Sequence, residues 1–414
     1  MTDRAQPPES VRCGRSRARD EKGQVLAFLV VVIVTLLAMA AFVVDIGYAY
    51  YVQRQLQASA DAAATAGATN LPDASAAVSA AQQYSGSAGG KNTGNTPPGV
   101  TTTVTTKCLT IAPCRPVNAV VVEQTTQVKT FFARVIGIDT LNVRAKATAC
   151  SPCSTRPADI MLVLDRTGSM CQDSNGNADP ACTDLNNARA GLKAFLALMD
   201  PSFHKIGFAV FPPAPSGGSN CITPQTAFYD STNSRYVLVP LSGDYLVGGV
   251  LNNSSALVST INCQQGGGRT AYATAIEQAQ AELDAHGRPD APDVIVFFSD
   301  VAANIGPAYY GNSSPYRTQP CHQGVNSAAG VKARGTVIYS IGYDLNANGG
   351  GANVCTSYTG SLEQPPITAY QAIQQIASAP DTFYNQPGPG ELVTIYTKIA
   401  ADVLGTRLIN DDTL

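Results

Sequence analysis

Three oxygen-bearing side chains follow one apolar run at alternate positions. The run at 159–165 (DIMLVLD) ends in Asp165, and Thr167 and Ser169 come two and four residues later. Gly168 lets the backbone turn sharply after the run. A carboxylate and two hydroxyls on one strand-to-helix turn are oxygen ligands, which suit a hard divalent cation such as Mg²⁺. The sequence therefore predicts part of a metal site on this turn.

Two further segments are expected to complete the site. Thr270 ends a glycine-rich stretch, GGGRT at 266–270, that opens a predicted helix, and Asp300 ends the strand-like run FFSD at 297–300. In a doubly wound sheet, ligands bind at the carboxyl ends of the strands. We therefore expect the loops to converge there, with one coordination position left open for a ligand. The predicted metal ligands are Asp165, Thr167, Ser169, Thr270 and Asp300.

From Ala158 onward the pattern alternates between strand and helix. Continuous apolar strands between helices indicate a mostly parallel sheet covered on both faces, so the expected fold class of 158–406 is doubly wound α/β. The predicted strands are 159–165, 206–211, 293–300, 335–343 and 381–386, and the predicted helices are 185–199, 270–285, 370–378 and 391–404.

An uninterrupted apolar segment occupies 23–44. As a helix it spans about 33 Å, close to the ~30 Å hydrocarbon core of a bilayer. Basic residues crowd the tail before it, whereas Arg54 alone is basic in the stretch 45–64. The positive-inside rule then places 1–22 in the cytoplasm and the rest outside the bacterial cell membrane. A cleaved signal peptide is the alternative, although its apolar core is usually shorter.

Residues 45–157, between the apolar segment and the first α/β strand, predict a helix followed by a few strands. Alanine-rich sequence predicts that the span continues as one helix to about Asn70. Residues 85–106 have the composition of a loop, whereas 117–149 predict two or three strands with a short helical turn at 131–136. We therefore expect a small α+β stalk over 45–150, a linker at 151–157 and a C-terminal tail at 407–414.

Charge and cysteine usage narrow the class of protein. The net charge is −3 and only 14% of residues are charged, so no basic field suggests nucleic acid. Of 11 cysteines, Cys13 alone precedes the apolar segment, and an even number outside it suggests disulfides in an oxidising compartment, with buried free thiols as the alternative. The expected sequence-local pairs are Cys108–Cys114, Cys150–Cys153, Cys171–Cys182, Cys221–Cys263 and Cys321–Cys355.

Other chemistry has weaker support. CSPC at 150–153 has thioredoxin-like spacing but lies in the linker rather than at a helix start. A zinc site from Cys108, Cys114, Cys150 and Cys153 is a further alternative. The sequence has no G-x-S-x-G motif, and GGGRT lacks the lysine of a phosphate-binding loop. We find no catalytic dyad and expect a protein that is not an enzyme.

The strand–DxTxS turn, the glycine-rich Thr270 and the strand-terminal Asp300 resemble the metal-ion-dependent adhesion site (MIDAS) of the von Willebrand factor A (VWA) domain. The resemblance covers 158–406. It implies that the five predicted ligands hold Mg²⁺, or Mn²⁺ or Ca²⁺, and that an acidic side chain of a protein partner completes the coordination. Thr167 stands where the family usually has Ser, and Val301 stands where a Gly usually follows the aspartate.

The N-terminal part resembles a second family. A basic tail, Gly-Gln, an apolar span, VVDIGYAYYVQRQLQASADAAATAGA and a strand-rich piece ending in RAKATA are similar to Tad/Flp pilus-assembly proteins of the TadE/TadG kind, over about 20–150. Those joined to a VWA domain look like TadG. The resemblance implies a role in Flp pilus assembly with pilus-assembly components as partners. A surface adhesin for host or environmental ligands, unrelated to pili, is the alternative.

Overall fold

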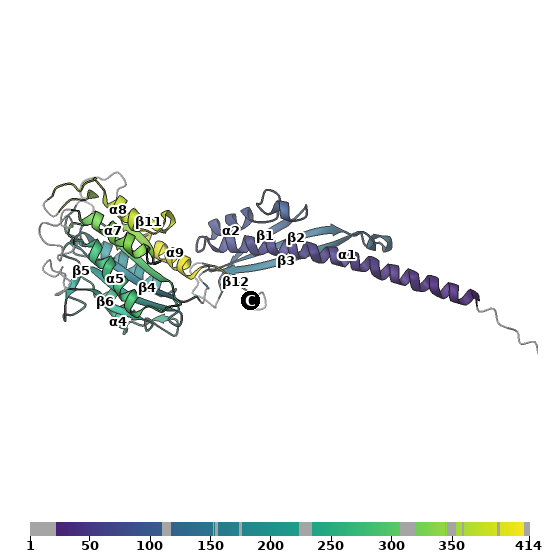
Figure 1. Ribbon diagram of the computed structural model, residues 1–414, viewed down its shortest axis with the longest axis horizontal. Helices are drawn as coiled ribbons and strands as arrows, with labels where there is room; N and C mark the ends of the chain where they lie inside the picture. The colour runs from purple at the N-terminus through teal and green to yellow at the C-terminus, as the bar shows by residue number, and fades with distance from the viewer. Residues whose placement is uncertain are drawn as a thin grey trace, which may run out of the picture.

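The computed structural model has a globular head at one end, a narrow stalk beside it, and a single long helix that continues alone toward the N-terminus (Figure 1). The head contains the strands and helices predicted after Ala158, and the stalk contains those predicted before it. The structure describes residues 22–109, 117–151, 153, 156–173, 176–222, 234–306, 319–343, 345, 353–357, 360–386 and 390–409.

Helix α1 (Lys22–Ala68) is the long helix of the stalk, as the sequence predicts. Its first half is apolar and exposed, and its second half packs on the stalk sheet through residues such as Leu56 and Ala63. Among the described residues, α1 is the one helix long and apolar enough to cross a membrane. Length and composition therefore agree with the predicted membrane anchor.

The stalk sheet has the order β1-β2-β3-β12, and every pair in it is antiparallel. The hairpin of β2 and β3, with the short turn η2 between them, confirms the strands and the helical turn expected in this region. Strand β1 overlaps the end of the segment 85–106 that is expected to be a loop. Its run of β-branched threonines around Val104 favours a strand, but the Gly and Pro residues before it dominate the composition of the segment. The elements are β1 (Thr101–Lys107), β2 (Ala119–Lys129), η2 (Ala133–Ile136), β3 (Thr140–Cys150) and α2 (Ala74–Gln83).

Residues 407–409 return to the stalk. We expected a tail at 407–414, but Arg407–Ile409 form β12 and pair antiparallel with β3, with Arg407 opposite Cys150. The physical reason is that β3 would otherwise present an unpaired edge, which readily accepts another strand. Residues 410–414 lie outside the described part of the chain.

The head contains a six-stranded sheet with the order β11-β10-β9-β4-β5-β6. All neighbouring strands are parallel except β5 and β6, so the expected mostly parallel α/β sheet is confirmed. Strand β6 was not predicted; it contains Pro240, which an edge strand tolerates and a central strand does not. The strands are β4 (Ala158–Asp165), β5 (His204–Pro215), β6 (Ser234–Ser242), β9 (Asp293–Ser299), β10 (Val337–Tyr343) and β11 (Phe383–Gln386).

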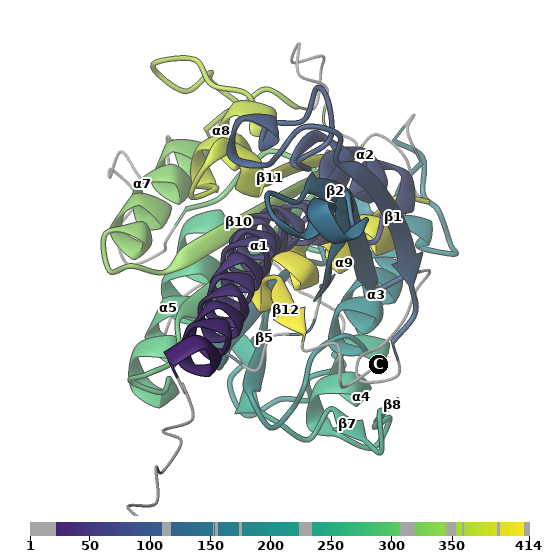
Figure 2. The same ribbon diagram turned by 90° about the vertical axis from the view of Figure 1, so that its right-hand side faces the viewer.

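Helices cover both faces of this sheet. Leu162 and Leu164 of β4 point into one apolar core and Met161 and Val163 into the other, which is the alternation of a central strand. Viewed along α1, helices α5 and α7 lie on one side and α3 and α4 on the other (Figure 2). Helices α4 and α7 were not predicted. One face carries α3 (Thr183–Leu196), α4 (Ala256–Asn262) and α9 (Leu392–Leu404), and the other carries α5 (Tyr272–His286), α7 (Pro320–Lys332) and α8 (Ala369–Ile376).

Disulfides form between sequence-local partners. The pair Cys108–Cys114 falls in part outside the described residues. The two cysteines of CSPC are bonded to each other, so their sulfurs are not thiolates that could bind zinc in this state. The other four expected pairs are present, namely Cys150–Cys153, Cys171–Cys182, Cys221–Cys263 and Cys321–Cys355.

Candidate metal centre

The predicted carboxylates meet at the carboxyl edge of the head sheet. Asp165 is the last residue of β4, and Asp300 directly follows the last residue of β9. These strands are parallel neighbours, with Leu164 opposite Phe298, so the two aspartates leave the sheet side by side. Topology alone thus brings together groups that are far apart in sequence.

A chain of hydrogen bonds joins four of the five predicted ligands. The backbone N–H of Thr167 donates to Asp165 Oδ1 at 2.8 Å. The hydroxyl oxygens of Thr167 and Ser169 lie 2.8 Å apart, and the Ser169 hydroxyl donates to Asp300 Oδ1, also at 2.8 Å. The turn that carries Ser169 is the short helix η3 (Gly168–Cys171). The structure therefore places these side chains within one compact oxygen-rich cluster.

Thr270 reaches the same edge on the glycine-rich loop. The Gly267 N–H donates to the carbonyl of Arg166 at 3.0 Å, which docks the loop on the turn that follows β4. In the described part of the chain, the hydrogen bonds of Thr270 are made by its backbone: its N–H donates to Asn304 Oδ1 at 3.0 Å and its carbonyl accepts from Asn304 N–H. Gly267 and Gly268 have φ values of 153° and 78°, so this docked loop conformation requires glycine.

Ser299 and Tyr272 support the site and were not singled out from the sequence. The Ser299 hydroxyl donates to Asp165 Oδ2 at 2.6 Å and lies 3.3 Å from the Tyr272 hydroxyl. The Tyr272 hydroxyl in turn donates to the Val301 carbonyl. Such outer partners fix the orientation of a metal ligand. The only sequence signal was the hydroxyl of Ser299 next to Asp300.

Arg166 anchors the turn that follows β4. It is fully buried, although the sequence places it in a turn. Its Nε donates to the Pro212 carbonyl and one terminal nitrogen donates to Gln264 Oε1, both at 2.9 Å. Arg166 thus fastens the turn to strand β5 and to the loop after α4, which restricts how far the side chains of the turn can move.

The electrostatics of the cluster favour a cation. Burial raises the pKa of Asp165 to about 6, against the opposing effect of the hydrogen bonds from Ser299 and Thr167. Burial, and then the nearby charge of Asp165, raise the pKa of Asp300 well above its usual range. Two adjacent carboxylates and an all-oxygen donor set fit a hard divalent cation, which would offset the repulsion. Ser169 and Asp300 are partly exposed, so the cluster is open to solvent on one side.

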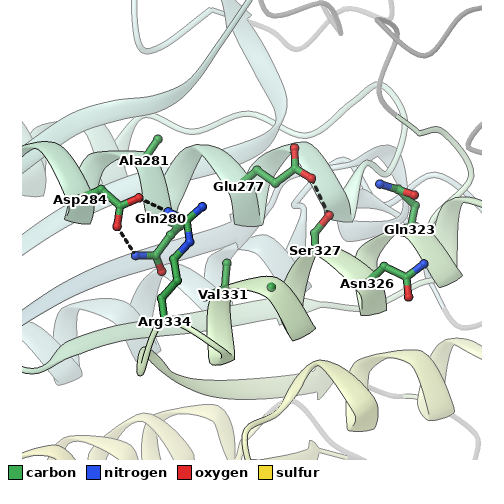
Figure 3. Close-up of a pocket in the computed structure, with 10 residues that line it drawn as sticks. Glu277, Gln280, Ala281, Asp284, Gln323, Asn326, Ser327, Val331 and Arg334 are labelled. Carbon is green, nitrogen blue, oxygen red and sulfur yellow. Dashed lines mark hydrogen bonds and ion pairs between the residues drawn. The ribbon is translucent and has the colours of Figure 1, made fainter.

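The head has a cysteine–glutamate cluster and a groove, and neither resembles the oxygen cluster at the sheet edge. Cys321, Cys355 and Glu363 lie close enough to hold a metal, but the cysteines form a disulfide and Glu363 accepts the N–H of Cys321 at the start of α7. A groove of about 520 Å³ lies between α5 and α7, and its polar lining includes hydrogen-bonded pairs such as Ser327 with Glu277 (Figure 3). None of the predicted metal ligands lines that groove.

The N-terminal part matches two family models. Residues 23–70 match the Flp pilus-assembly TadE/G-like family, and residues 53–149 match the Tad-like Flp pilus-assembly family. Together the two matches span residues 23–149. This confirms the resemblance drawn from the sequence for that part of the chain. No curated protein matches the chain.

Several solved structures are similar to the chain at low identity. The pilus adhesin SpaC from Lactobacillus rhamnosus GG is 15% identical, with a TM-score of 0.42; the match covers 75% of this chain and 35% of SpaC. The VWF domain of the type V pili tip protein Mfa5 from Porphyromonas gingivalis is 14% identical, with a TM-score of 0.41 and coverage of 60% and 95%. Proximal thread matrix protein 1 from the mussel byssus, with a zinc-occupied MIDAS motif, is 15% identical, with a TM-score of 0.34 and coverage of 60% and 48%. This chain spans about a third of the length of SpaC.

Proposed function

We propose that this protein is a membrane-anchored, extracytoplasmic factor of Flp pilus assembly that binds a protein partner through a divalent cation. The observation that carries the proposal is the accessible oxygen cluster in which Asp165, Ser169 and Asp300 are connected by hydrogen bonds at the sheet edge. The proposed ligands are Asp165, Thr167, Ser169, Thr270 and Asp300, and the proposed ion is Mg²⁺, or Mn²⁺ or Ca²⁺.

The charge of the cluster suits an acidic partner. Asp165 and Asp300 together balance a divalent cation, while the hydroxyls of Thr167, Ser169 and Thr270 add neutral oxygen ligands. An additional ligand approaches from the open side beside Ser169 and Asp300. A carboxylate of the partner is a strong ligand for a hard cation, so an acidic side chain completes the coordination.

The anchor and the disulfides support the cellular location. We propose that 1–22 are cytoplasmic and that the stalk and head lie outside the membrane, because the basic residues precede the apolar helix. The disulfides of the head fit an oxidising compartment. Protease added to spheroplasts is expected to degrade the head, and a protected head would contradict this topology.

Calorimetric titration of the full-length protein in detergent with Mg²⁺ and Mn²⁺ tests the metal site. Asp165→Asn keeps the volume of the side chain and removes its charge, so we expect it to abolish binding. The matched control is Asp284→Asn in the groove between α5 and α7, which we expect to bind as wild type does. Wild-type affinity in Asp165→Asn would refute the metal site.

Crosslinking in cells identifies the partner. We expect crosslinks to the head that disappear with a chelator and in Asp165→Asn, and we expect pilus-assembly components among the captured proteins. The Tad-like region at 23–149 favours this outcome over a surface adhesin. Metal-dependent binding to host or environmental ligands alone would support the adhesin instead.

A further inference from the structure

The tip of the β2–β3 hairpin is apolar and exposed. We use the name hairpin tip for residues 131–138 (FFARVIGI), which include η2. Val135 is 84% exposed and Ile136 is 64% exposed, far more than apolar side chains of a folded stalk usually are. Arg134 is the one charged residue of the tip. The exposed apolar side chains are Phe131, Phe132, Val135, Ile136 and Ile138.

A buried carboxylate fixes the hairpin tip to the anchor helix. Asp45 of α1 is 3% exposed, and its two oxygens accept the backbone N–H groups of Phe131, Phe132 and Ala133 at 2.6, 3.0 and 2.6 Å. The Phe131 ring also packs edge-on against Tyr48, with ring centroids 5.4 Å apart. The exposed side chains are therefore held in a defined place and not on a loose loop.

The hairpin tip lies beside the part of α1 that precedes Asp45, which is the apolar half of the helix. An apolar groove of about 220 Å³ is formed by Ala38, Ala41 and Phe42 of α1 together with side chains of the hairpin tip, among them Val135 and Ile136. Residues 38–42 belong to the apolar half of α1. In Figure 1 the closed end of the hairpin lies along α1 on the side from which the helix continues alone.

The length of α1 decides whether this level is inside the bilayer. If the hairpin tip were in water, the hydrocarbon core would have to end before Ala38. Residues 22–37 would then span only about 24 Å, less than the ~30 Å that is required. If the core instead ends at Asp45, Ala38 lies about 10 Å inside it.

We propose that the hairpin tip is a second membrane contact, inserted beside α1 into the outer leaflet of the phospholipid bilayer. This inference rests on the proposed anchoring by α1 and adds to it. Elements that lie in the interface bury their apolar side chains by about 5–10 Å, which agrees with the depth of the groove. Lys129 and Asp139, which flank the tip and are exposed, would lie at the headgroup level.

Lipid explains the exposed apolar side chains of the hairpin tip better than a protein partner does. The groove borders the apolar half of α1 and shares its level, so acyl chains that surround α1 also reach it. The single charge of the tip, on Arg134, is positive, and a long basic side chain can extend to lipid phosphates. A second copy of the chain or a pilus subunit remains an outcome of the experiment.

Tryptophan fluorescence tests the insertion directly, because the protein contains no tryptophan. Three single variants of the full chain, all from exposed valines, are reconstituted into phosphatidylcholine vesicles with or without brominated acyl chains. Val135→Trp reports on the hairpin tip. Val34→Trp, within the span, is the positive control, and Val247→Trp, on a hairpin of the head, is the negative control.

We expect brominated lipid to quench Val135→Trp and Val34→Trp and to leave Val247→Trp unchanged. Bromine near the headgroup end should quench Val135→Trp more than bromine near the chain end. An unquenched Val135→Trp beside a quenched Val34→Trp would overturn the insertion and leave the anchoring intact. A blue-shifted but unquenched Val135→Trp would mean that protein covers the tip. An unquenched Val34→Trp would refute the anchoring itself.

Discussion

The stalk and the head each contain a buried aspartate, and the surroundings of the two carboxylates differ. Asp45 in the stalk receives three backbone N–H groups from one turn. Asp165 in the head receives one backbone N–H and the Ser299 hydroxyl, and it lies near a second carboxylate, Asp300. A buried carboxylate that is surrounded by donors stabilises the fold, whereas one placed beside another carboxylate costs stability unless a cation is bound.

The largest expected effect separates these two roles in the metal-free protein. Asp45→Ala leaves three backbone N–H groups without their acceptor, so we expect its melting temperature to fall by roughly 5–10 °C. Asp165→Ala removes a carboxylate that lacks its cation, so its melting temperature in chelator should stay near that of wild type or rise. Thermal unfolding of both variants in detergent measures the difference. Equal losses would show that Asp165 is structural as well.

The pH dependence sharpens the same contrast. The pKa of Asp165 is raised to about 6 in the folded, metal-free head, above the value of about 3.9 for an unfolded aspartate. The folded state therefore keeps a proton that the unfolded state has lost, and this stabilisation is complete below about pH 4 and disappears as pH rises through about 6. We expect the metal-free head to become less stable over that range.

Added Mg²⁺ should reverse this trend. At a hundredfold excess over Kd, a ligand that binds only the folded state adds about 2.7 kcal/mol. Because protons compete with the metal for the carboxylates, this gain should be large at pH 8 and small at pH 5. Melting curves with Mg²⁺ and with chelator at several pH values test the prediction. A gain that is independent of pH would place the bound metal elsewhere.

The smallest expected effect concerns a supporting residue. Ser299→Ala removes the hydroxyl that orients Asp165, and we expect Mg²⁺ affinity to fall about tenfold, with the melting temperature in chelator little changed. The control is Ser327→Ala, which removes a serine that also donates to a carboxylate, but far from the cluster, in the α5–α7 groove. Titration calorimetry should show wild-type affinity for the control. An unchanged affinity in Ser299→Ala would remove it from the site.

The regular parts of both regions could be predicted from local sequence. Continuous apolar runs specify β4, β9 and β10, and the alanine-rich stretch specifies α1. The missed elements lack such a pattern. Strand β6 contains Pro240, α4 is short, and α7 has glycine and polar residues within it, so their structure depends on packing against the sheet.

The cluster of oxygen-bearing side chains was easier to predict than the residues that support it. The alternate spacing of Asp165, Thr167 and Ser169 is visible in one short segment, and Asp300 ends an apolar run. Asp45 and its turn are more than 80 residues apart, and Ser299 and Asp165 are 134 apart. Contacts between distant residues leave no local pattern, so these roles become visible only when the strands are placed side by side.

The return of β12 to the stalk has a consequence for how the head can turn. The chain passes between stalk and head twice, once after β3 and once before β12, and the two crossings lie side by side where Arg407 pairs with Cys150. A head connected to the stalk by one segment alone could rotate about that segment. Two adjacent crossings restrict the rotation of the head about the stalk more than one crossing would. The edge of the head sheet that carries the proposed ligands is therefore restricted in its rotation about the long axis of the stalk.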